Sequence, residues 1–288
     1  CLDGDDRAAH GGTPFVQWYL QQVCSYQAAH GVRLVDYLDL HYYPQGDGVV
    51  DFSDPPNGSE TALISARRLR SLKELNDPAW DSESWLSDLG NSAPWHYSRP
   101  NLIPRVRAWI DASCPGTGLS ISEYNWGADN GASSALAQAE ALAIFAREGV
   151  DMAARWVAPG TGSLVERAFR LYLDFDGSGG HVSGHSTRAS SASIDALGAY
   201  AIHQPGAHVM LLLFNKATTA TTAAVNLGTH LSGPWQLYQF SGSSDIALVA
   251  SGTLDGTGIS LANLPPRSAS LLILPDSDRI FADSFDQP

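Results

Sequence analysis

The sequence has very little positive charge, which limits the partners that it can bind. Lysine occurs only at Lys73 and Lys216, and the 288 residues carry a formal net charge of -13. An acidic surface repels a phosphate backbone, so we expect no nucleic-acid partner. Long apolar runs are also missing. None approaches the roughly 20 residues that a membrane-spanning helix needs, so we expect no membrane partner either.

Cysteine is scarce as well, with Cys1, Cys24 and Cys114 as the three examples. No two of them form a Cys-x-x-Cys pair, which argues against a zinc site or a redox motif. A disulfide between Cys24 and Cys114 is one alternative, and free thiols at both positions are the other. Aromatic residues are plentiful by comparison, with 8 tryptophans and 10 tyrosines. Most such rings pack in a core, but flat aromatic rings also line ligand-binding clefts, including those for sugars.

One short stretch, from Leu119 to Gly127, organises the rest of the chain. Leu119 and Ile121 alternate with serines in the period-two pattern of a strand, which ends at Glu123. Tyr124 and a glycine-containing loop follow. A carboxylate at the point where a strand gives way to a loop is the arrangement of sugar-cleaving barrels. The competing interpretation is a strand-end glutamate that faces water or caps the next helix.

The first 175 residues alternate between helical and strand-like patterns. Helices are predicted near residues 14–30, 60–75, 102–113, 134–148 and 163–173, and strands at residues 32–43, 119–123 and 150–157. Such alternation predicts parallel strands joined by helices. Because parallel strands share a direction, their ends lie on one rim. We expect that rim to gather His41, Tyr43, Glu123, Tyr124 and Trp156.

After about residue 176 the composition changes, with threonine, serine, alanine and glycine in place of lysine and glutamate. Seven short apolar runs follow at hairpin spacing: 199–202, 208–214, 223–227, 235–240, 246–251, 259–261 and 269–274. This pattern predicts an antiparallel β-sandwich. The expected domains are an α/β region at residues 1–175, the all-β sandwich at 176–275 and a polar tail at 276–288.

Two strand motifs carry a family resemblance. The segments DYLDLHYYPQ at residues 36–45 and ISEYNWG at 121–127, followed by Asn215-Lys216, resemble glycoside hydrolase family 44. The resemblance extends over roughly residues 1–275. It implies a retaining endo-β-1,4-glucanase that acts on β-1,4-glucan or xyloglucan. It also implies a (β/α)8 TIM barrel beside a β-sandwich. About three βα units of the barrel are present here, so the barrel is incomplete.

The same resemblance implies roles for individual residues. Glu123 aligns with the catalytic nucleophile, on the seventh barrel strand. His41 and Tyr43 lie on the sixth strand, where they are expected to contact the nucleophile or the sugar. Trp156 on the eighth strand is expected to form a floor under the sugar. Three residues beside the nucleophile complete the predicted substrate-binding set: Tyr124, Asn125 and Trp126.

One part of the family pattern is missing. The family places its acid/base glutamate after an asparagine on the fourth strand, and this sequence contains no Asn-Glu pair. The other glutamates, mostly on predicted helices, are Glu60, Glu74, Glu83, Glu140, Glu148 and Glu166. Three strands cannot close an eight-stranded barrel. We therefore expect the C-terminal part of a longer hydrolase, with exposed sheet edges and weak or no activity alone.

Two other functions are compatible with parts of the sequence. A non-catalytic polysaccharide-binding protein fits the sandwich and the tryptophan-rich rim. A serine hydrolase fits less well, because the Gly-x-Ser-x-Gly elbow is missing around Ser186. No cofactor or catalytic metal is expected. The Asp174-x-Asp176-Gly segment resembles part of a calcium loop, and a linker turn is the alternative. A monomer is expected, as is secretion from a bacterium, because polymeric glucans lie outside the cell.

Overall fold

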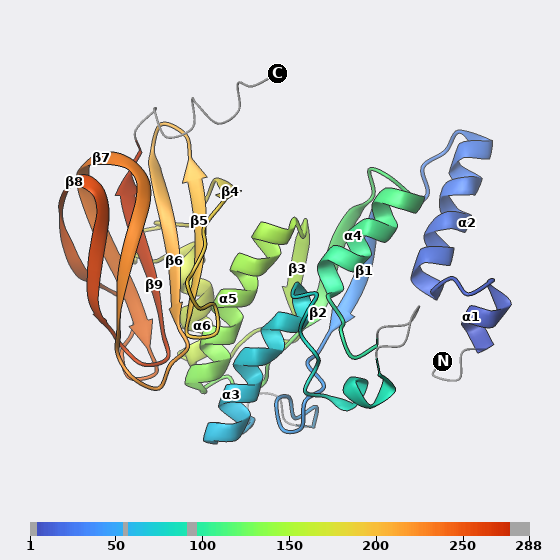
Figure 1. Cartoon of the computed structure of the whole chain (residues 1–288), viewed down its shortest axis with the longest axis horizontal. Coiled ribbons are helices and arrows are strands. Elements are labelled where there is room, and N and C mark those ends of the chain that lie inside the picture. The colour runs from blue at the N-terminus through green and yellow to red at the C-terminus, as the bar shows by residue number, and fades with distance from the viewer. Residues whose placement is uncertain (1–4, 54–56, 91–96, 277–288) are drawn as a thin grey trace. The chain divides into compact units, whose positions relative to one another are not determined.

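The computed structural model of the chain describes residues 5–53, 57–90 and 97–276 (Figure 1). The chain divides into two units that are interleaved along the sequence. The parallel-sheet unit consists of Cys1–Gln45, Lys73–Asn125 and Glu148–Trp156, and the antiparallel-sheet unit of Gly46–Leu72, Trp126–Arg147 and Val157–Pro288. The predicted domain boundary near residue 175 stays a prediction, and almost all of the predicted tail lies outside the described residues.

The parallel-sheet unit contains the three expected strands. They are β1 (Tyr37–Tyr42), β2 (Gly118–Tyr124) and β3 (Met152–Arg155), in the order β1-β2-β3 and all parallel. Leu119 and Ile121 in the central strand are fully buried. In β1, by contrast, Leu38 and Tyr42 are buried, while Asp39 and His41 are exposed. β1 therefore buries only one of its faces, although its apolar sequence predicts a strand covered on both sides.

The helices of this unit are α1 (Asp5–Ala9), α2 (Phe15–His30), the 3-10 helix η3 (Trp85–Leu89) and α4 (Leu102–Ser113). Of these, α2 and α4 begin and end close to where the sequence predicts them. Gly31 ends α2 in the left-handed conformation, with φ 65°, which glycine adopts without steric cost. A disulfide joins Cys24 on α2 to Cys114 at the end of α4. The polar, glycine-containing segment at residues 1–12 is expected to be a loop, and α1 shows that this expectation is wrong for Asp5–Ala9.

The antiparallel-sheet unit contains three helices that the sequence also predicts: α3 (Ala62–Arg70), α5 (Ala132–Glu148) and α6 (Leu164–Leu173). The side chains of Thr61 and Ser163 accept hydrogen bonds from backbone amides in the first turns of α3 and α6. After α3 the chain tightens into the 3-10 helix η2 (Ser71–Leu75), so the predicted helix at 60–75 is two elements. No helix in the described ranges is long and apolar enough to cross a membrane.

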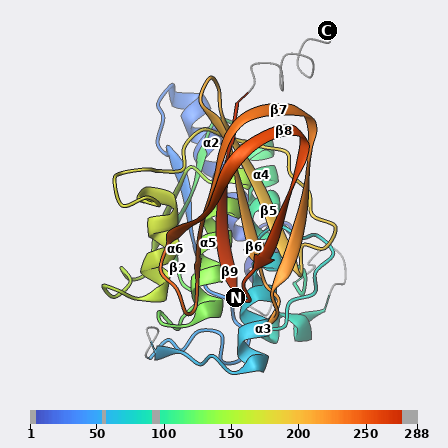
Figure 2. The ribbon, with the colours of Figure 1, turned by 90° about the vertical axis from the view of Figure 1, so that its left-hand side faces the viewer.

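Six antiparallel strands form one sheet in this unit, in the order β4-β5-β6-β9-β7-β8. They are β4 (His185–Thr187), β5 (Leu197–Gln204), β6 (His208–Asn215), β7 (Thr221–Ser241), β8 (Ala247–Leu264) and β9 (Ser268–Pro275). Figure 2 shows β7 and β8 as the long, curved strands of this sheet, and α5 lies along the sheet (Figure 1). One apolar cluster joins leucines of β7 and β8 to those of β6 and β9, including Leu231, Leu254 and Leu272.

Four of the predicted strands are therefore halves of two long ones. β7 covers the predicted strands at 223–227 and 235–240, and β8 covers those at 246–251 and 259–261. The pairing register of β7 shifts between Asn226 and Leu231, around Gly228. Glycines that predict chain reversals thus permit bends within a continuing strand. The prediction of antiparallel strands is confirmed, but all six belong to one hydrogen-bonded sheet.

Candidate active site

Glu123 lies near the carboxyl end of β2. Two side chains contact it: His41 from β1, and Tyr43, the residue that follows β1. The Tyr43 hydroxyl donates a hydrogen bond of 2.8 Å to Glu123 Oε2. His41 Nδ1 lies 3.3 Å from the same oxygen. The Glu123 side chain is 27% exposed and that of His41 is 51% exposed. The structure therefore brings Glu123, His41 and Tyr43 together at a site that solvent can reach.

A β-bulge directs the Glu123 side chain to this place. Leu40 pairs with Ile121, but His41 pairs with Glu123, so Ser122 is an extra residue in β2. The pairing of β2 with β3 contains a shift over the same stretch, between Ile121 and Tyr124. Bulges of this kind bend a strand and re-aim the side chains that follow, and they are common beside active sites.

Asp39 stabilises the bulge from the neighbouring strand. Its carboxylate accepts a 3.0 Å hydrogen bond from the Ser122 amide and a second one from the Ser122 hydroxyl. Asp39 thus supplies an acceptor for an amide that the bulge removes from the regular ladder. Its second oxygen lies 4.0 Å from His41 Nε2, so the imidazole stands between two carboxylates.

The protonation states of the two side chains from β1 follow from these contacts. Burial, together with the hydrogen bond to Glu123 and the negative charge there, raises the pKa of Tyr43 to about 12. Tyr43 therefore remains a hydroxyl donor throughout the physiological range. Burial alone would raise the pKa of Asp39, but hydrogen bonds from serine side chains and the Ser122 amide outweigh it and lower this pKa. Asp39 therefore remains an acceptor.

Asn125 connects the ends of β2 and β3. Its amide nitrogen donates to the Trp156 carbonyl, its oxygen accepts a 3.0 Å hydrogen bond from Arg155, and the side chain is buried. The Trp156 amide also donates to the Tyr124 carbonyl at 3.1 Å. Trp156 is 53% exposed, whereas the neighbouring Tyr124 is buried. Asn125 therefore fixes the backbone that presents the exposed Trp156 ring.

Trp126 belongs to the antiparallel-sheet unit, where its ring is 1% exposed and its indole nitrogen donates to Ser71 Oγ at 3.2 Å. Its backbone carbonyl accepts a hydrogen bond of 2.7 Å from Arg68. The predicted roles of Trp126, Tyr124, Asn125 and the other residues of this group in substrate binding stay predictions.

The other glutamates are engaged in contacts of their own. Glu74 binds Tyr42 and Ser82, Glu140 binds Lys216 and Tyr200, Glu148 binds Asn76, and Glu166 binds the Gly162 amide. Glu60 precedes α3, so its prediction on a helix is wrong, and its carboxylate binds Arg68 at 2.7 Å. Glu83 lies in an irregular segment, as predicted.

Sequence reasoning overlooked Asp39 and Arg155 as members of this site. A signal for Asp39 exists, because it lies two residues before His41 on a predicted strand and must share its face. No comparable signal identifies Arg155, because its partner Asn125 follows a different strand, β2, 30 residues earlier in the chain.

The candidate calcium loop is a set of turns in the structure. Asp176 Oδ1 accepts hydrogen bonds from the Ser178 and Gly180 amides, and Asp174 Oδ1 accepts one from the Gly179 amide. The hydrogen bond from the Gly180 amide has the largest effect on the pKa of Asp176 and, together with that from the Ser178 amide, lowers it. Within the described ranges, no three His, Cys, Asp or Glu side chains group as metal ligands would. The structural calcium ion stays a prediction.

Comparison with known proteins adds an independent observation. The family model for glycoside hydrolase family 44 matches residues 2–46 of the chain, which include β1 and His41. The resemblance to this family is thereby confirmed. The chain is a relative of the family 44 glycoside hydrolases.

Curated relatives and a solved structure extend the likeness over most of the chain. The chain is 31% identical over 216 residues to beta-mannanase/endoglucanase A of Caldicellulosiruptor saccharolyticus, and the match covers 70% of this chain and 16% of that protein. It is 29% identical over 269 residues to endoglucanase A of Paenibacillus lautus, covering 90% and 37%. The crystal structure of CelM2, a bifunctional glucanase-xylanase from a metagenome library, has a TM-score of 0.84 at 32% identity, covering 94% and 50%. The chain thus spans at most half the length of these three relatives.

Proposed function

We propose that the chain is the nucleophile-bearing part of a retaining endo-β-1,4-glucanase or xyloglucanase. The observation that carries the proposal is the Glu123 carboxylate, partly exposed, with a tyrosine hydroxyl at 2.8 Å and an imidazole at 3.3 Å on one oxygen. Relatives named endoglucanases, over 70% and 90% of this chain, support the same reaction class.

Glu123 has the surroundings that a nucleophile needs. In the first step of a retaining hydrolase, a carboxylate oxygen bonds to the anomeric carbon while the glycosidic bond breaks and the leaving oxygen takes a proton. A hydrogen bond to the ionised carboxylate favours the charged form, which is the reactive one. The Tyr43 hydroxyl provides this bond, and its pKa of about 12 keeps its proton in place.

The proton donor of this reaction lies, in our proposal, in residues of the whole enzyme beyond these 288. A retaining enzyme needs a second carboxyl group about 5–5.5 Å from the nucleophile. Glu60, Glu74, Glu140, Glu148 and Glu166 have the partners described above, and both oxygens of Asp39 serve Ser122. The chain alone is then expected to have weak or no activity.

The proposal places the parallel sheet within a (β/α)8 barrel. Three parallel strands with helices between them are the repeating element of such barrels, whose active sites lie at the carboxyl ends of the strands. Glu123 and Trp156 both lie at that end of their strands. The remaining strands would pair with the open edges of β1 and β3, because an eight-stranded closure leaves no edge free.

The substrate we propose is a β-1,4-glucan or a xyloglucan. The exposed Trp156 ring offers a flat apolar surface beside the Glu123 strand, and His41 and Tyr43 offer hydrogen bonds. A polymer of this kind cannot enter a cell, so the enzyme would act outside it as a secreted bacterial protein. We propose a monomer that needs no cofactor.

Trapping of the covalent intermediate tests the proposal in the whole enzyme. A 2-fluoro-cellobioside with a good leaving group should inactivate it, and peptide mass spectrometry should find the glycosyl group on Glu123. The Glu123→Gln variant should lose more than about 1,000-fold in kcat and resist labelling. A label on another residue would contradict the assignment. Undiminished binding without any hydrolysis would favour the non-catalytic polysaccharide-binding protein.

A further inference from the structure

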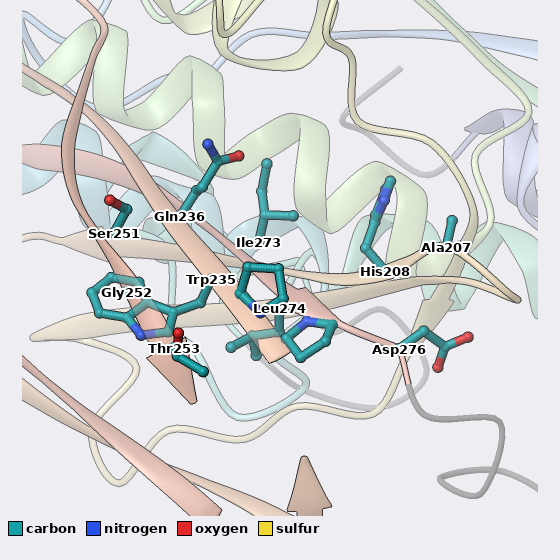
Figure 3. Close-up of a pocket in the computed structure, with 12 residues that line it drawn as sticks. Ala207, His208, Trp235, Gln236, Ser251, Gly252, Thr253, Ile273, Leu274 and Asp276 are labelled. Carbon is teal, nitrogen blue, oxygen red and sulfur yellow. The ribbon is translucent and has the colours of Figure 1, made fainter. Parts of the chain in front are cut away.

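The antiparallel-sheet unit contains two hollows of different chemical character. A groove of about 810 Å³ runs along β7 and β8, beside the start of β6 and the end of β9 (Figure 3). Its one lining carboxylate, Asp276, already accepts a hydrogen bond of 2.7 Å from the Gly206 amide. A smaller pocket of about 220 Å³ is lined instead by three cationic side chains. On a chain with a net charge of -13, such a concentration of positive charge is distinctive.

The cations of the smaller pocket come from segments that are far apart in the sequence. Arg70 is the last residue of α3, Lys216 follows β6, and Arg267 lies in the turn between β8 and β9. Two apolar residues of α3 and Asp195 complete the lining. Because like charges repel, the fold gathers these groups at a cost in free energy that nearby anions offset.

The buried side chain of Asn215 holds together the segments that present Lys216 and Arg267. Its amide nitrogen donates to the carbonyls of Leu264 and Pro265, at 3.0 and 2.7 Å. One of the segments that carry the family resemblance, residues 215–216, therefore has a structural role that the Glu123 site does not use. A binding group that the fold fixes in this way loses less entropy when a ligand arrives.

Arg267 has an unusual backbone conformation and an unused side chain. Its φ is 49°, in the left-handed region that a residue with a Cβ atom rarely adopts. Such a conformation persists where the surrounding structure imposes it, and it is frequent at ligand sites. The Arg267 guanidinium is partly buried and forms no hydrogen bond or ion pair within the described ranges. Its five N–H donors thus remain available.

The carboxylates around the pocket do not cancel its charge. Lys216 Nζ donates to Glu140 Oε1 at 2.9 Å, and Asp195 is the one acidic lining residue. Burial lowers the pKa of Arg267 and the charge of Glu60 opposes this, but Glu60 is paired with another arginine at 2.7 Å. An arginine keeps its proton in proteins. One positive charge therefore remains, and Arg267 carries it.

We propose that this pocket binds a small oxyanion, a carboxylate or a phosphate group, with the Arg267 guanidinium as its main contact and Arg70 and Lys216 as supporting charges. The planar fork of a guanidinium matches two oxygens of such a group. The volume is below the roughly 300 Å³ at which sites for larger ligands begin. It therefore suits an inorganic anion or one acidic sugar. The site is separate from Glu123, and the proposal holds whether or not Glu123 is a nucleophile.

Isothermal titration of the 288-residue chain tests this proposal. The ligands are sodium glucuronate and, separately, sodium phosphate, with glucose as the neutral counterpart of glucuronate. At least one anion should bind, glucose should not, and added sodium chloride should weaken the binding. Tighter binding of glucuronate would identify an acidic sugar as the source of the oxyanion, and tighter binding of phosphate would identify an inorganic ion.

Variants of the cations locate the site. Arg267→Gln should raise the dissociation constant by about tenfold or more, because it removes charged hydrogen bonds. Arg267→Lys keeps the charge without the paired donors and should fall between. Arg70→Gln should raise the dissociation constant several-fold, and it tests the pocket independently if the Arg267 variants fail to fold. Circular dichroism would establish folding of each protein.

Arg188→Gln is the matched control for net charge. Arg188 is an exposed arginine of the same unit that does not line the pocket, so its variant should bind the anion as the parent does. Three results would each overturn the proposal: no binding of either anion by the parent, equal binding of glucose, or an equal loss of affinity in Arg188→Gln and Arg267→Gln.

Discussion

Each unit of the chain contains a glutamate that accepts a hydrogen bond from a tyrosine hydroxyl, and the two pairs serve different ends. In the parallel-sheet unit, Tyr43 binds Glu123 at 2.8 Å, and the carboxylate is 27% exposed. In the antiparallel-sheet unit, Tyr200 binds Glu140 at 3.1 Å, and the carboxylate is 1% exposed. The chemical groups are alike, but only Glu123 is open to a substrate.

The charge partners differ as well. Glu140 has Lys216 at 2.9 Å, whereas Glu123 has the imidazole of His41. Burial raises the pKa of Glu140, and the ammonium group of Lys216 opposes that rise. Glu140 Oε2 is buried without a hydrogen-bond partner among the described residues. The comparison teaches that the buried carboxylate of Glu140, paired with a lysine, ties α5 to the sheet, whereas the carboxylate of Glu123, next to a tyrosine hydroxyl and an imidazole, stays partly exposed.

The largest expected effect on stability comes from removing Lys216, the cation of the buried pair with Glu140. Lys216→Met would leave the Glu140 charge buried without its ammonium partner, and we expect a loss of about 3–5 kcal/mol in the free energy of unfolding. Urea denaturation at neutral pH would measure it. Lys73→Met is the matched control, because the only other lysine lies 4.4 Å from the centre of the Trp80 ring and contributes about 1 kcal/mol or less.

The pH dependence of this variant has a definite sign. The pKa of Glu140 is raised in the folded state, so the folded chain binds a proton that the unfolded chain releases. Stability therefore falls as the pH rises from 4.5 through the folded pKa. The deficit of Lys216→Met should shrink in acid, where Glu140 is protonated, and the double variant with Glu140→Gln should recover much of it. A deficit that is independent of pH would contradict the charge argument.

The disulfide of the parallel-sheet unit is expected to contribute nearly as much to the free energy of unfolding as the Lys216–Glu140 pair does. Cys24 and Cys114 are 90 residues apart, so the bond closes a long loop and constrains the unfolded chain. Cys24→Ser should lower the free energy of unfolding by about 2–4 kcal/mol, and dithiothreitol should lower that of the parent equally. A parent that is unaffected by dithiothreitol while free thiols appear would contradict this.

Removal of the Tyr43 hydroxyl, measured in the whole enzyme, tests the exposed pair of Tyr43 and Glu123. Tyr43→Phe should lower kcat/KM by about 10–100-fold, because hydrogen bonds to charged groups are worth about 1.5–3 kcal/mol. The neighbouring Tyr42 is the control, as it donates to the buried Glu74 at 3.0 Å. Tyr42→Phe should lower stability and leave kcat/KM unchanged.

The smallest expected effect belongs to Asp39. Asp39→Ala removes the acceptor of the Ser122 amide and hydroxyl, so the bulge that aims Glu123 loses its support. The residue is partly exposed, and solvent reduces the cost to about 1 kcal/mol in stability and less than about tenfold in kcat/KM. Asp39→Asn keeps an oxygen for the Ser122 amide and should fall between the parent and the alanine variant. An unchanged rate in Asp39→Ala would show that the bulge does not need this support.

Much of the local structure could be predicted because its signals are local. Gly31 ends α2, Thr61 and Ser163 begin α3 and α6, and the alternation around Ile121 predicts β2. The antiparallel strands were harder. A glycine such as Gly228 has the same local preferences in a hairpin turn as in a bend within a long strand, and only the pairing partner distinguishes the two.

By itself, the sequence determined the three parallel strands, the position of Glu123 near the end of one of them and the family to which the chain is related. Strand period and helix caps act over a few residues, which is why they can be read along the chain. Only the tertiary structure decided the contacts of each glutamate with its partners: Tyr43 and His41 reach Glu123 across 80 or more residues, and Lys216 reaches Glu140 across 76. Such contacts arise from strand register and packing, and these depend on every neighbouring element at once.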